Sequence, residues 1–174
     1  FHYMPVGNEA APVLMPSADQ RTWMIQQIRH FRQTKPIFTI DFQNDAEYVG
    51  GCIAGGRRYL HINANGDVDP CVFIHYSNMN IREHTLLEAL QSPLFKAYYH
   101  NQPFNGNMLQ PCPMLENPEI LPRLVRQSGA VSTDLQSPES AEHLCAKCQN
   151  YAQLWKIRSQ QIWQELHPQA DKEK

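Results

Sequence analysis

The sequence has no long hydrophobic run, no block of basic residues and none of the common hydrolase motifs. No apolar stretch approaches the roughly 20 residues that cross a bilayer, so we expect no membrane association. The net charge is -2, with 15 basic and 17 acidic residues and no cluster of either sign, so nucleic acid is not an expected partner. Gly-x-Ser-x-Gly, P-loop and His-Glu-x-x-His motifs are absent. Hydrolase and nucleotidyl activities therefore have no support.

A secretory leader is also lacking. Residues 1–6 read like an interior strand and have neither a basic nor a long apolar leader region, so we expect the natural protein to extend upstream and to reside in the cytoplasm. The cysteine count is five, which leaves at least one thiol over from any pairing. A pair of disulfides with one free thiol is therefore a weak alternative, and a metal site is favoured in a reducing compartment.

The N-terminal part of the chain predicts a strand, a helix and a second strand. Residues 1–6 form the first expected strand, and the capping box of Ser17 and Gln20 begins the helix. Pro36 prevents the helix from continuing, and residues 37–42 are β-branched and aromatic, as in a strand. The apolar stripe expected on the helix consists of Met24, Ile28 and Phe31. The pattern is one βαβ step.

A β-hairpin is the firmest local prediction. The composition changes at the glycine-dense residues 50–56, and we place a boundary near residue 48. Residues 58–63 and 68–74 are strand-like and flank an Asn-Gly pair. Asn-Gly favours a type I′ turn, which requires positive φ at both central residues. The hairpin would carry Cys71 on its second strand, with Cys52 in the loop before it.

Helices are predicted after the hairpin. Capping signals at Thr85, Ser92 and Asn117, the last two followed by proline, predict helices over about 85–91, 93–99 and 118–127. A last helix is expected over about 138–166. Its apolar face would consist of Leu144, Cys148, Tyr151, Trp155, Ile162 and Leu166.

The positions of the five cysteines suggest that they are metal ligands. Closing the hairpin brings Cys52 and Cys71 toward one ribbon, and the prolines on both sides of Cys112 stiffen its loop. Cys145 and Cys148 are three residues apart, so they are neighbours on one helix face. Thiolate sets with a short Cys-x-x-Cys bind [4Fe-4S] clusters or structural zinc, and the ligand set alone does not choose between them.

The run over residues 50–73 resembles the opening of the SPASM and twitch domains, which has a cysteine, a hairpin glycine, four residues and a second cysteine. Residues 80–96 are similar to the segment that follows in the same families, and the resemblance covers roughly residues 48–150. It implies an α+β fold in which residues 1–48 are the end of a radical SAM (β/α) barrel. Residues 49–174 would be a SPASM/twitch-like auxiliary cluster domain, with a β-hairpin and several helices.

The resemblance also implies a function. Cys52 and Cys71 would bind an auxiliary [4Fe-4S] cluster, with Cys112, Cys145 and Cys148 competing for the other two places. The cluster would serve electron transfer or substrate binding in a radical SAM oxidoreductase that acts on a peptide or small molecule, with a flavodoxin or ferredoxin as a possible electron donor. S-adenosylmethionine and a second [4Fe-4S] cluster would belong to the full-length protein, because this chain lacks the CxxxCxxC motif. This chain alone is therefore not expected to generate the radical. A non-enzymatic zinc module is the alternative.

Catalytic residues cannot be assigned, but several polar side chains are secondary candidates. His61 and His75 could supply a non-cysteine ligand, although solvent-facing strand positions are the default. Arg57 and Arg58 could donate hydrogen bonds or positive charge to cluster sulfurs. On the barrel interpretation, the residues that could face substrate or S-adenosylmethionine are His2, Tyr3, Asp41 and Asp45.

Overall fold

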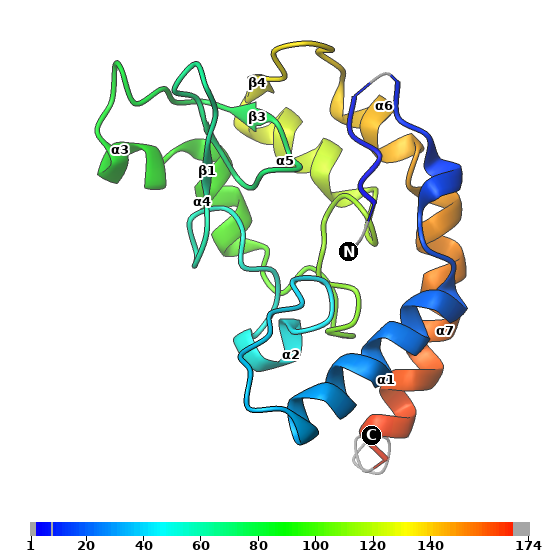
Figure 1. The fold of residues 1–174 in the computed structure, drawn as a ribbon. Helices are drawn as coiled ribbons and strands as arrows, with labels where there is room; N and C mark the ends of the chain where they lie inside the picture. The colour runs from blue at the N-terminus through cyan, green and yellow to red at the C-terminus, as the bar shows by residue number, and fades with distance from the viewer. Residues whose placement is uncertain (1–2, 8, 169–174) are drawn as a thin grey trace.

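The computed structural model describes residues 3–7 and 9–168 (Figure 1). Its elements, in chain order, are η1 (Pro12–Leu14), α1 (Ala18–Thr34), α2 (Ala46–Val49), β1 (His61–Ile62), β2 (Val68–Asp69), β3 (Tyr76–Ser77), α3 (Leu86–Leu90), α4 (Pro93–His100), α5 (Ile120–Ser128), β4 (Val131–Ser132), α6 (Ala141–Ala146) and α7 (Gln149–Leu166). The strands form two antiparallel pairs, β1 with β2 and β3 with β4. The described chain is therefore a mixture of helices and two small sheets.

The predicted β-hairpin is present in a shorter form. β1 and β2 pair antiparallel, and the ladder ends before Pro70, which has no N–H to donate. The chain then bends back, and Cys71 and Ile74 pair in an isolated bridge. The expectation that the strands cover 58–63 and 68–74 is therefore wrong, and Cys71 lies in the bend beyond the second strand.

The turn of the hairpin is not of type I′. Gly66 has a φ of 90°, but Asn65 does not have a positive φ. Instead, the side-chain oxygen of Asn63 accepts the N–H of Asn65 at 2.9 Å and that of Asp67 at 3.0 Å. An asparagine side chain that bonds to the backbone two residues later makes a turn of its own. The Asn63 side chain thus shapes this turn. The Asn-Gly pair had predicted a turn that depends on backbone conformation alone.

Helix α1 begins at the predicted capping box, but it buries an unexpected face. Ser17 accepts the N–H of Gln20, whose side chain accepts the N–H of Ser17. Phe31 is 37% exposed, and Met24 and Ile28 are only half-buried, so the predicted apolar stripe is not the core face. Figure 1 shows α1 running beside α7, and this packing selects the buried face. The buried residues of α1 are Arg21, Thr22 and Ile25.

Residues 37–42 do not form the predicted strand. They follow α1 as an unpaired segment, and Phe38 is 86% exposed. A strand needs a neighbour for its backbone groups, and none lies beside this segment in the described chain. The other predicted strand, over residues 1–6, lies partly outside the described residues, and residues 3–6 have no regular structure.

The short helices after the hairpin follow their capping signals. Thr85 caps α3 through a capping box with Glu88, and Ser92 caps α4 by accepting the N–H of Phe95. Helix α5 begins later than predicted, at Ile120. The Asn117 side-chain oxygen, which would have capped the helix, instead accepts from the Asn105 side chain at 2.8 Å, and its amide group donates to the carbonyls of Gln110 and Cys112.

The last predicted helix is two helices. Ser140 caps α6, which ends at Ala146, and α7 begins at Gln149 with Cys148 as its N-cap residue. Leu166 is 38% exposed, so it is the one predicted core residue of this face that the core does not cover. The predicted residues that are buried are Leu144, Cys148, Tyr151, Trp155 and Ile162.

The apolar core lies between the C-terminal helices and the two sheets. Leu94 of α4, Leu121 of α5, Leu144 of α6 and Trp155 of α7 are each at most 2% exposed. The loops that carry the cysteines pack against this core. No helix in the described residues is long and apolar enough to span a bilayer.

Candidate metal centre

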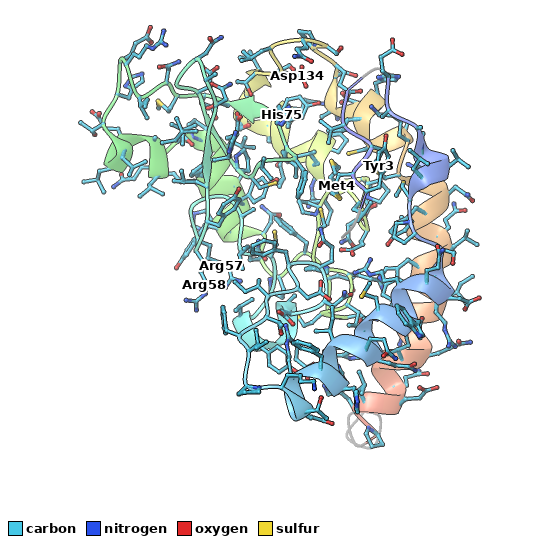
Figure 2. The ribbon with its side chains drawn as sticks, in the orientation of Figure 1. Tyr3, Met4, Arg57, Arg58, His75 and Asp134 are labelled. Atoms are coloured by element: carbon cyan, nitrogen blue, oxygen red, sulfur yellow. The ribbon has the colours of Figure 1, made fainter. Side chains whose placement is uncertain are left out.

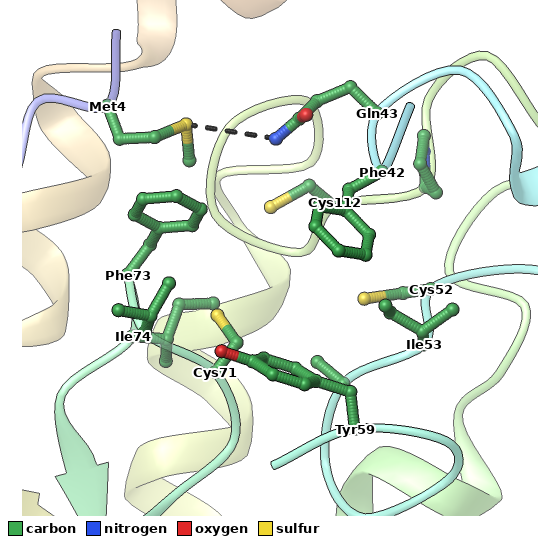
Figure 3. Close-up of a pocket in the computed structure, with 13 residues that line it drawn as sticks. Met4, Phe42, Gln43, Cys52, Ile53, Tyr59, Cys71, Phe73, Ile74 and Cys112 are labelled. Atoms are coloured by element: carbon green, nitrogen blue, oxygen red, sulfur yellow. Dashed lines mark hydrogen bonds between the residues drawn. The ribbon is translucent and has the colours of Figure 1, made fainter. Parts of the chain in front are cut away.

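Three of the five cysteines surround one pocket. Cys52 comes from the glycine-dense loop, Cys71 from the bend after β2, and Cys112 from the Pro-Cys-Pro loop before α5. Figure 3 shows their sulfur atoms around the same space, which has a volume of about 160 Å³. The fold therefore brings together thiols that are up to 60 residues apart in the sequence.

The rest of the pocket wall is mostly apolar. Phe42 and Tyr59 stack with their ring centroids 6.3 Å apart, and Phe73 closes the opposite side (Figure 3). Gln43 donates to the sulfur of Met4 at 4.0 Å. The lining residues other than the cysteines are Met4, Phe42, Gln43, Ile53, Ala54, Tyr59, Val72, Phe73, Ile74 and Pro111.

Burial keeps the three thiols protonated in the metal-free protein. It raises the pKa of Cys52 to about 11, against the opposing effect of the Ala54 backbone. Burial, followed by the charge of Cys52, raises the pKa of Cys71 to about 12. The pKa of Cys112 is raised well above its usual value by burial and then by the charge of Glu116. A metal centre with positive charge would supply the compensation that these thiolates lack.

A side-chain amide and a guanidinium fix the backbone at Cys52. Gln102 accepts the N–H of Cys52 and donates to its carbonyl, both at 3.2 Å. The Arg57 guanidinium donates to the carbonyls of Cys52, Gly51 and Val49 at 2.8 to 3.1 Å. Arg57 therefore orients the loop through its carbonyl groups, and its charge partly opposes the rise that burial causes in the pKa of Cys52.

The loop of Cys112 is held at three points. One carboxylate oxygen of Glu116 accepts the Cys112 N–H at 2.7 Å, and the Asn117 side chain donates to the Cys112 carbonyl at 3.0 Å. The N–H of Leu115 points at the Cys112 sulfur, 3.4 Å away. Backbone N–H groups directed at sulfur stabilise thiolates in metal centres. The loop is thus shaped to present a thiolate to the pocket.

A buried ion pair connects this loop to the N-terminal helix. Arg21 of α1 contacts Glu116 at 2.6 Å, and both side chains are completely buried. The Arg21 guanidinium also donates to Tyr151 and Asn44 at 3.0 Å, and it lies 4.0 Å above the ring of Trp155. The pKa of Arg21 remains raised because Glu116 and Tyr151 outweigh burial. This network joins α1, α7 and the Cys112 loop.

Cys145 and Cys148 are buried away from the pocket wall. Cys145 lies in α6 and Cys148 at the start of α7, and both are at most 1% exposed. Burial raises the pKa of both thiols, to about 12 for Cys148. Neither residue lines the 160 Å³ pocket. The pocket is therefore lined by three of the five predicted ligands and not by this pair.

The predicted histidine ligands have other surroundings. Figure 2 shows His75 beside Asp134, and its ring nitrogens contact the Asp134 carboxylate at 3.0 Å and the Val72 carbonyl at 2.8 Å. His61 lines a separate polar pocket with His75. Both residues lie outside the wall of the cysteine pocket, so the structure does not bring them to the thiols.

The acidic and tyrosine candidates of the N-terminal segment are also engaged elsewhere. Asp45 forms an ion pair with Arg32 at 2.7 Å, and Asp41 accepts from Asn44 at 2.6 Å. The Tyr3 hydroxyl accepts the N–H of Ala11 at 2.8 Å. Arg58 is exposed, in contrast to the anchored Arg57 (Figure 2). His2 lies outside the described residues.

The three pocket thiols do not converge on a single point in the described residues. Within residues 3–7 and 9–168, no three His, Cys, Asp or Glu side chains converge closely enough to hold one metal ion. Zinc requires sulfur atoms at about 2.3 Å from one point. The pocket volume of about 160 Å³ leaves room for a group larger than one water molecule. Three thiols, N–H groups directed at sulfur and an apolar wall suit an iron-sulfur cluster.

These features define a pocket lined by three thiols and apolar side chains. Residues 52–114 match the family model for SPASM, described as an iron-sulfur cluster-binding domain. This match confirms the resemblance of the sequence to a SPASM domain over residues 52–114 and supports iron-sulfur cluster binding. The matched stretch includes Cys52, Cys71 and Cys112 and ends before Cys145. No curated protein and no solved structure matches the chain.

Sequence reasoning missed the residues that position the cysteines. Arg21 lies off the expected apolar stripe, and a buried arginine is rare enough that a pattern does not predict it. Gln102 is 50 residues from Cys52, so no local signal connects them. Glu116 lies four residues after Cys112, and this short spacing is the one signal that could have suggested a role.

Proposed function

We propose that this chain binds an auxiliary [4Fe-4S] cluster of a radical SAM oxidoreductase, with Cys52, Cys71 and Cys112 as three of its ligands. The observation that carries the proposal is the convergence of these three thiols, from three different loops, on one apolar pocket inside the SPASM match. The fourth ligand would come from Cys145 or Cys148, or from a molecule that enters the pocket. When bound, the cluster would supply one-electron chemistry or a Lewis-acidic iron.

The pocket itself supports a redox or substrate-binding role. Its mostly apolar wall makes the surroundings of the thiolates less polar, which would favour the less charged of two oxidation states and so tune a reduction potential. Tyr59 and Gln43 provide polar groups at the wall that could orient a substrate. The substrate would be a peptide or small molecule, and a flavodoxin or ferredoxin could supply electrons.

An exposed apolar surface beside the pocket supports an upstream barrel. Ile37, Ile40 and Phe42 are each between 57% and 61% exposed, and Phe38 more so. A groove of about 400 Å³ lies next to them, lined by Met24, Ile28, Phe73 and part of the same segment. Contiguous apolar surface of this kind marks an interaction site. We propose that residues 37–42 pair with a strand of a preceding (β/α) barrel, which would bind S-adenosylmethionine and its own cluster.

Anaerobic reconstitution of the 174-residue chain tests the proposal. With iron and sulfide, we expect a brown protein that contains about four iron and four sulfide per chain and that bleaches on reduction. A matched sample is incubated with zinc alone. If the sample given iron and sulfide stays colourless and holds no acid-labile sulfide, while the sample given zinc binds one zinc tightly, the chain is a zinc module and the cluster assignment is refuted.

A further inference from the structure

Tyr59 brings a hydroxyl group into the wall of the cysteine pocket. Among the described residues that line this pocket, the polar side chains other than the cysteines are those of Tyr59 and Gln43. The Gln43 amide is directed at the sulfur of Met4, 4.0 Å away, whereas the Tyr59 hydroxyl points toward Cys71 (Figure 3). A phenol in a mostly apolar wall usually has a hydrogen-bond partner, and the side chain that this one faces is a cysteine.

The backbone of Tyr59 is tied to the loop that carries Cys52. The N–H of Tyr59 donates to the carbonyl of Ile53 at 3.1 Å, and the Tyr59 carbonyl accepts the N–H of Gly56 at 3.0 Å. The ring stacks on Phe42, with the centroids 6.3 Å apart and the ring planes 27° from parallel. Because contacts hold both the backbone and the ring, the phenol extends from the Cys52 loop to the Cys71 side of the pocket (Figure 3).

The surroundings of this phenol keep it protonated. Burial raises the pKa of Tyr59, and the charge of Cys71 raises it further, against the opposing effect of the Val72 backbone. The contribution of Cys71 agrees with the direction in which the hydroxyl group points. A protonated phenol can donate a hydrogen bond, and a thiolate can accept one. The pocket therefore holds an O–H donor directed at a candidate ligand.

We propose that, when the cluster is bound, the Tyr59 hydroxyl donates a hydrogen bond to the Cys71 thiolate and raises the reduction potential of the cluster. The inference rests on the proposed function. Cluster binding converts the Cys71 thiol into a thiolate, which is a stronger acceptor. A donor to a ligand sulfur stabilises the more negative, reduced state, so it raises the potential. Tyr59 thus acts on the cluster through Cys71, which leaves Gln43 as the polar group of the wall that a substrate would meet.

Tyr59→Phe tests the proposal, with Tyr99→Phe as the control. Phenylalanine keeps the ring that stacks on Phe42 and removes only the hydroxyl group. Tyr99 is 68% exposed on α4 and does not line the pocket. After anaerobic reconstitution to equal iron content, a titration with dithionite followed by electron paramagnetic resonance should show a lower potential for Tyr59→Phe. We expect a roughly tenfold smaller equilibrium constant for reduction, which is about 59 mV for one electron. The Tyr99→Phe potential should equal that of the wild type.

Replacement of Tyr59 by 3-fluorotyrosine distinguishes a hydrogen bond from a general change in the polarity of the pocket. The fluorinated phenol is more acidic and is therefore a stronger donor, so the potential should rise above that of the wild type, opposite to Tyr59→Phe. This variant keeps the hydroxyl group, so the inference stays testable even if Tyr59→Phe takes up no cluster.

Two kinds of failure are distinguishable. An unchanged potential in either loaded variant of Tyr59, or a shift of both in the same direction, would overturn the inference. Failure of the wild-type chain to take up a cluster would instead refute the proposed function.

Discussion

Glu116 accepts the backbone N–H of Cys112 with one carboxylate oxygen, at 2.7 Å. Its other oxygen contacts Arg21 at 2.6 Å, in the interior of the protein. The same carboxylate therefore holds a candidate cluster ligand and anchors the N-terminal helix. A movement of α1 relative to α7 would therefore shift Glu116 and, through it, the Cys112 loop.

Loss of Arg21 should be strongly destabilising. Arg21→Met leaves the Glu116 carboxylate buried without its cation, which typically costs about 3–5 kcal/mol. The control is Arg126→Met, which breaks an ion pair with Glu142 whose side chains are 72% and 56% exposed. That change should alter the free energy of unfolding by less than about 0.5 kcal/mol. Urea unfolding of the metal-free chains measures both, and equal effects would contradict the assigned role of the buried pair.

Single cysteine substitutions should separate the ligands from the other thiols. We expect Cys52→Ala, Cys71→Ala and Cys112→Ala each to lose more than about half of the iron bound by the wild type, because a cluster held by too few thiolates is labile. At most one of Cys145→Ala and Cys148→Ala should lose iron to the same extent. Iron and sulfide analysis after anaerobic reconstitution measures this, with circular dichroism as a check of the fold. Full loading of Cys112→Ala would remove that residue from the proposed site.

Gly55 should not tolerate a side chain. Its φ is 69°, and a Cβ atom would lie 2.6 Å from Tyr98, so Gly55→Ala combines backbone strain with a clash. Gly129 has a φ of 66°, and a methyl group added there would meet nothing within 4 Å, so Gly129→Ala isolates the backbone strain. We expect a cost of about 1 kcal/mol at Gly129 and about 2–4 kcal/mol at Gly55, measured by urea unfolding. Similar costs at the two positions would show that the packing against Tyr98 is loose.

Asp69 should make the stability of the metal-free chain fall as pH rises. Burial raises the pKa of this carboxyl to about 6 from 3.8, against the opposing hydrogen bond from Thr133 and the charge of His75. The pKa of Asp69 is higher in the folded state than in the unfolded state. Its favourable contribution to the free energy of unfolding is therefore complete below about pH 4 and is lost as pH rises through about 6. The loss is about 1–3 kcal/mol.

Asp69→Asn removes this titration. Its stability relative to the wild type should therefore increase between about pH 4 and pH 7, as measured by urea unfolding. Asp134→Asn is the control, because the Ser137 backbone lowers the pKa of Asp134 and so moves its titration below this window. A difference between Asp69→Asn and the wild type that stays constant with pH would show that Asp69 is not the titrating group.

Much of the local structure could be read from the sequence. The capping boxes at Ser17 and Thr85 and the serine cap at Ser92 begin helices where predicted, because each depends on a few adjacent residues. The hairpin between Cys52 and Cys71 is also present, although Asn63 shapes its turn and Pro70 shortens its ladder. Local signals predicted where these elements lie but not how long they are.

The sequence by itself determined the resemblance of residues 52–114 to a SPASM domain, through the spacing of cysteines along the chain. It favoured Cys52 and Cys71 as ligands and left Cys112, Cys145 and Cys148 competing for the other two places. Only the tertiary structure placed Cys112 with Cys52 and Cys71, and only it gave Arg21 a buried partner and directed the Tyr59 hydroxyl group toward Cys71. The physical reason is that caps and turns depend on neighbouring residues, whereas the meeting of three loops depends on how the helices pack, and packing joins residues that no local pattern connects.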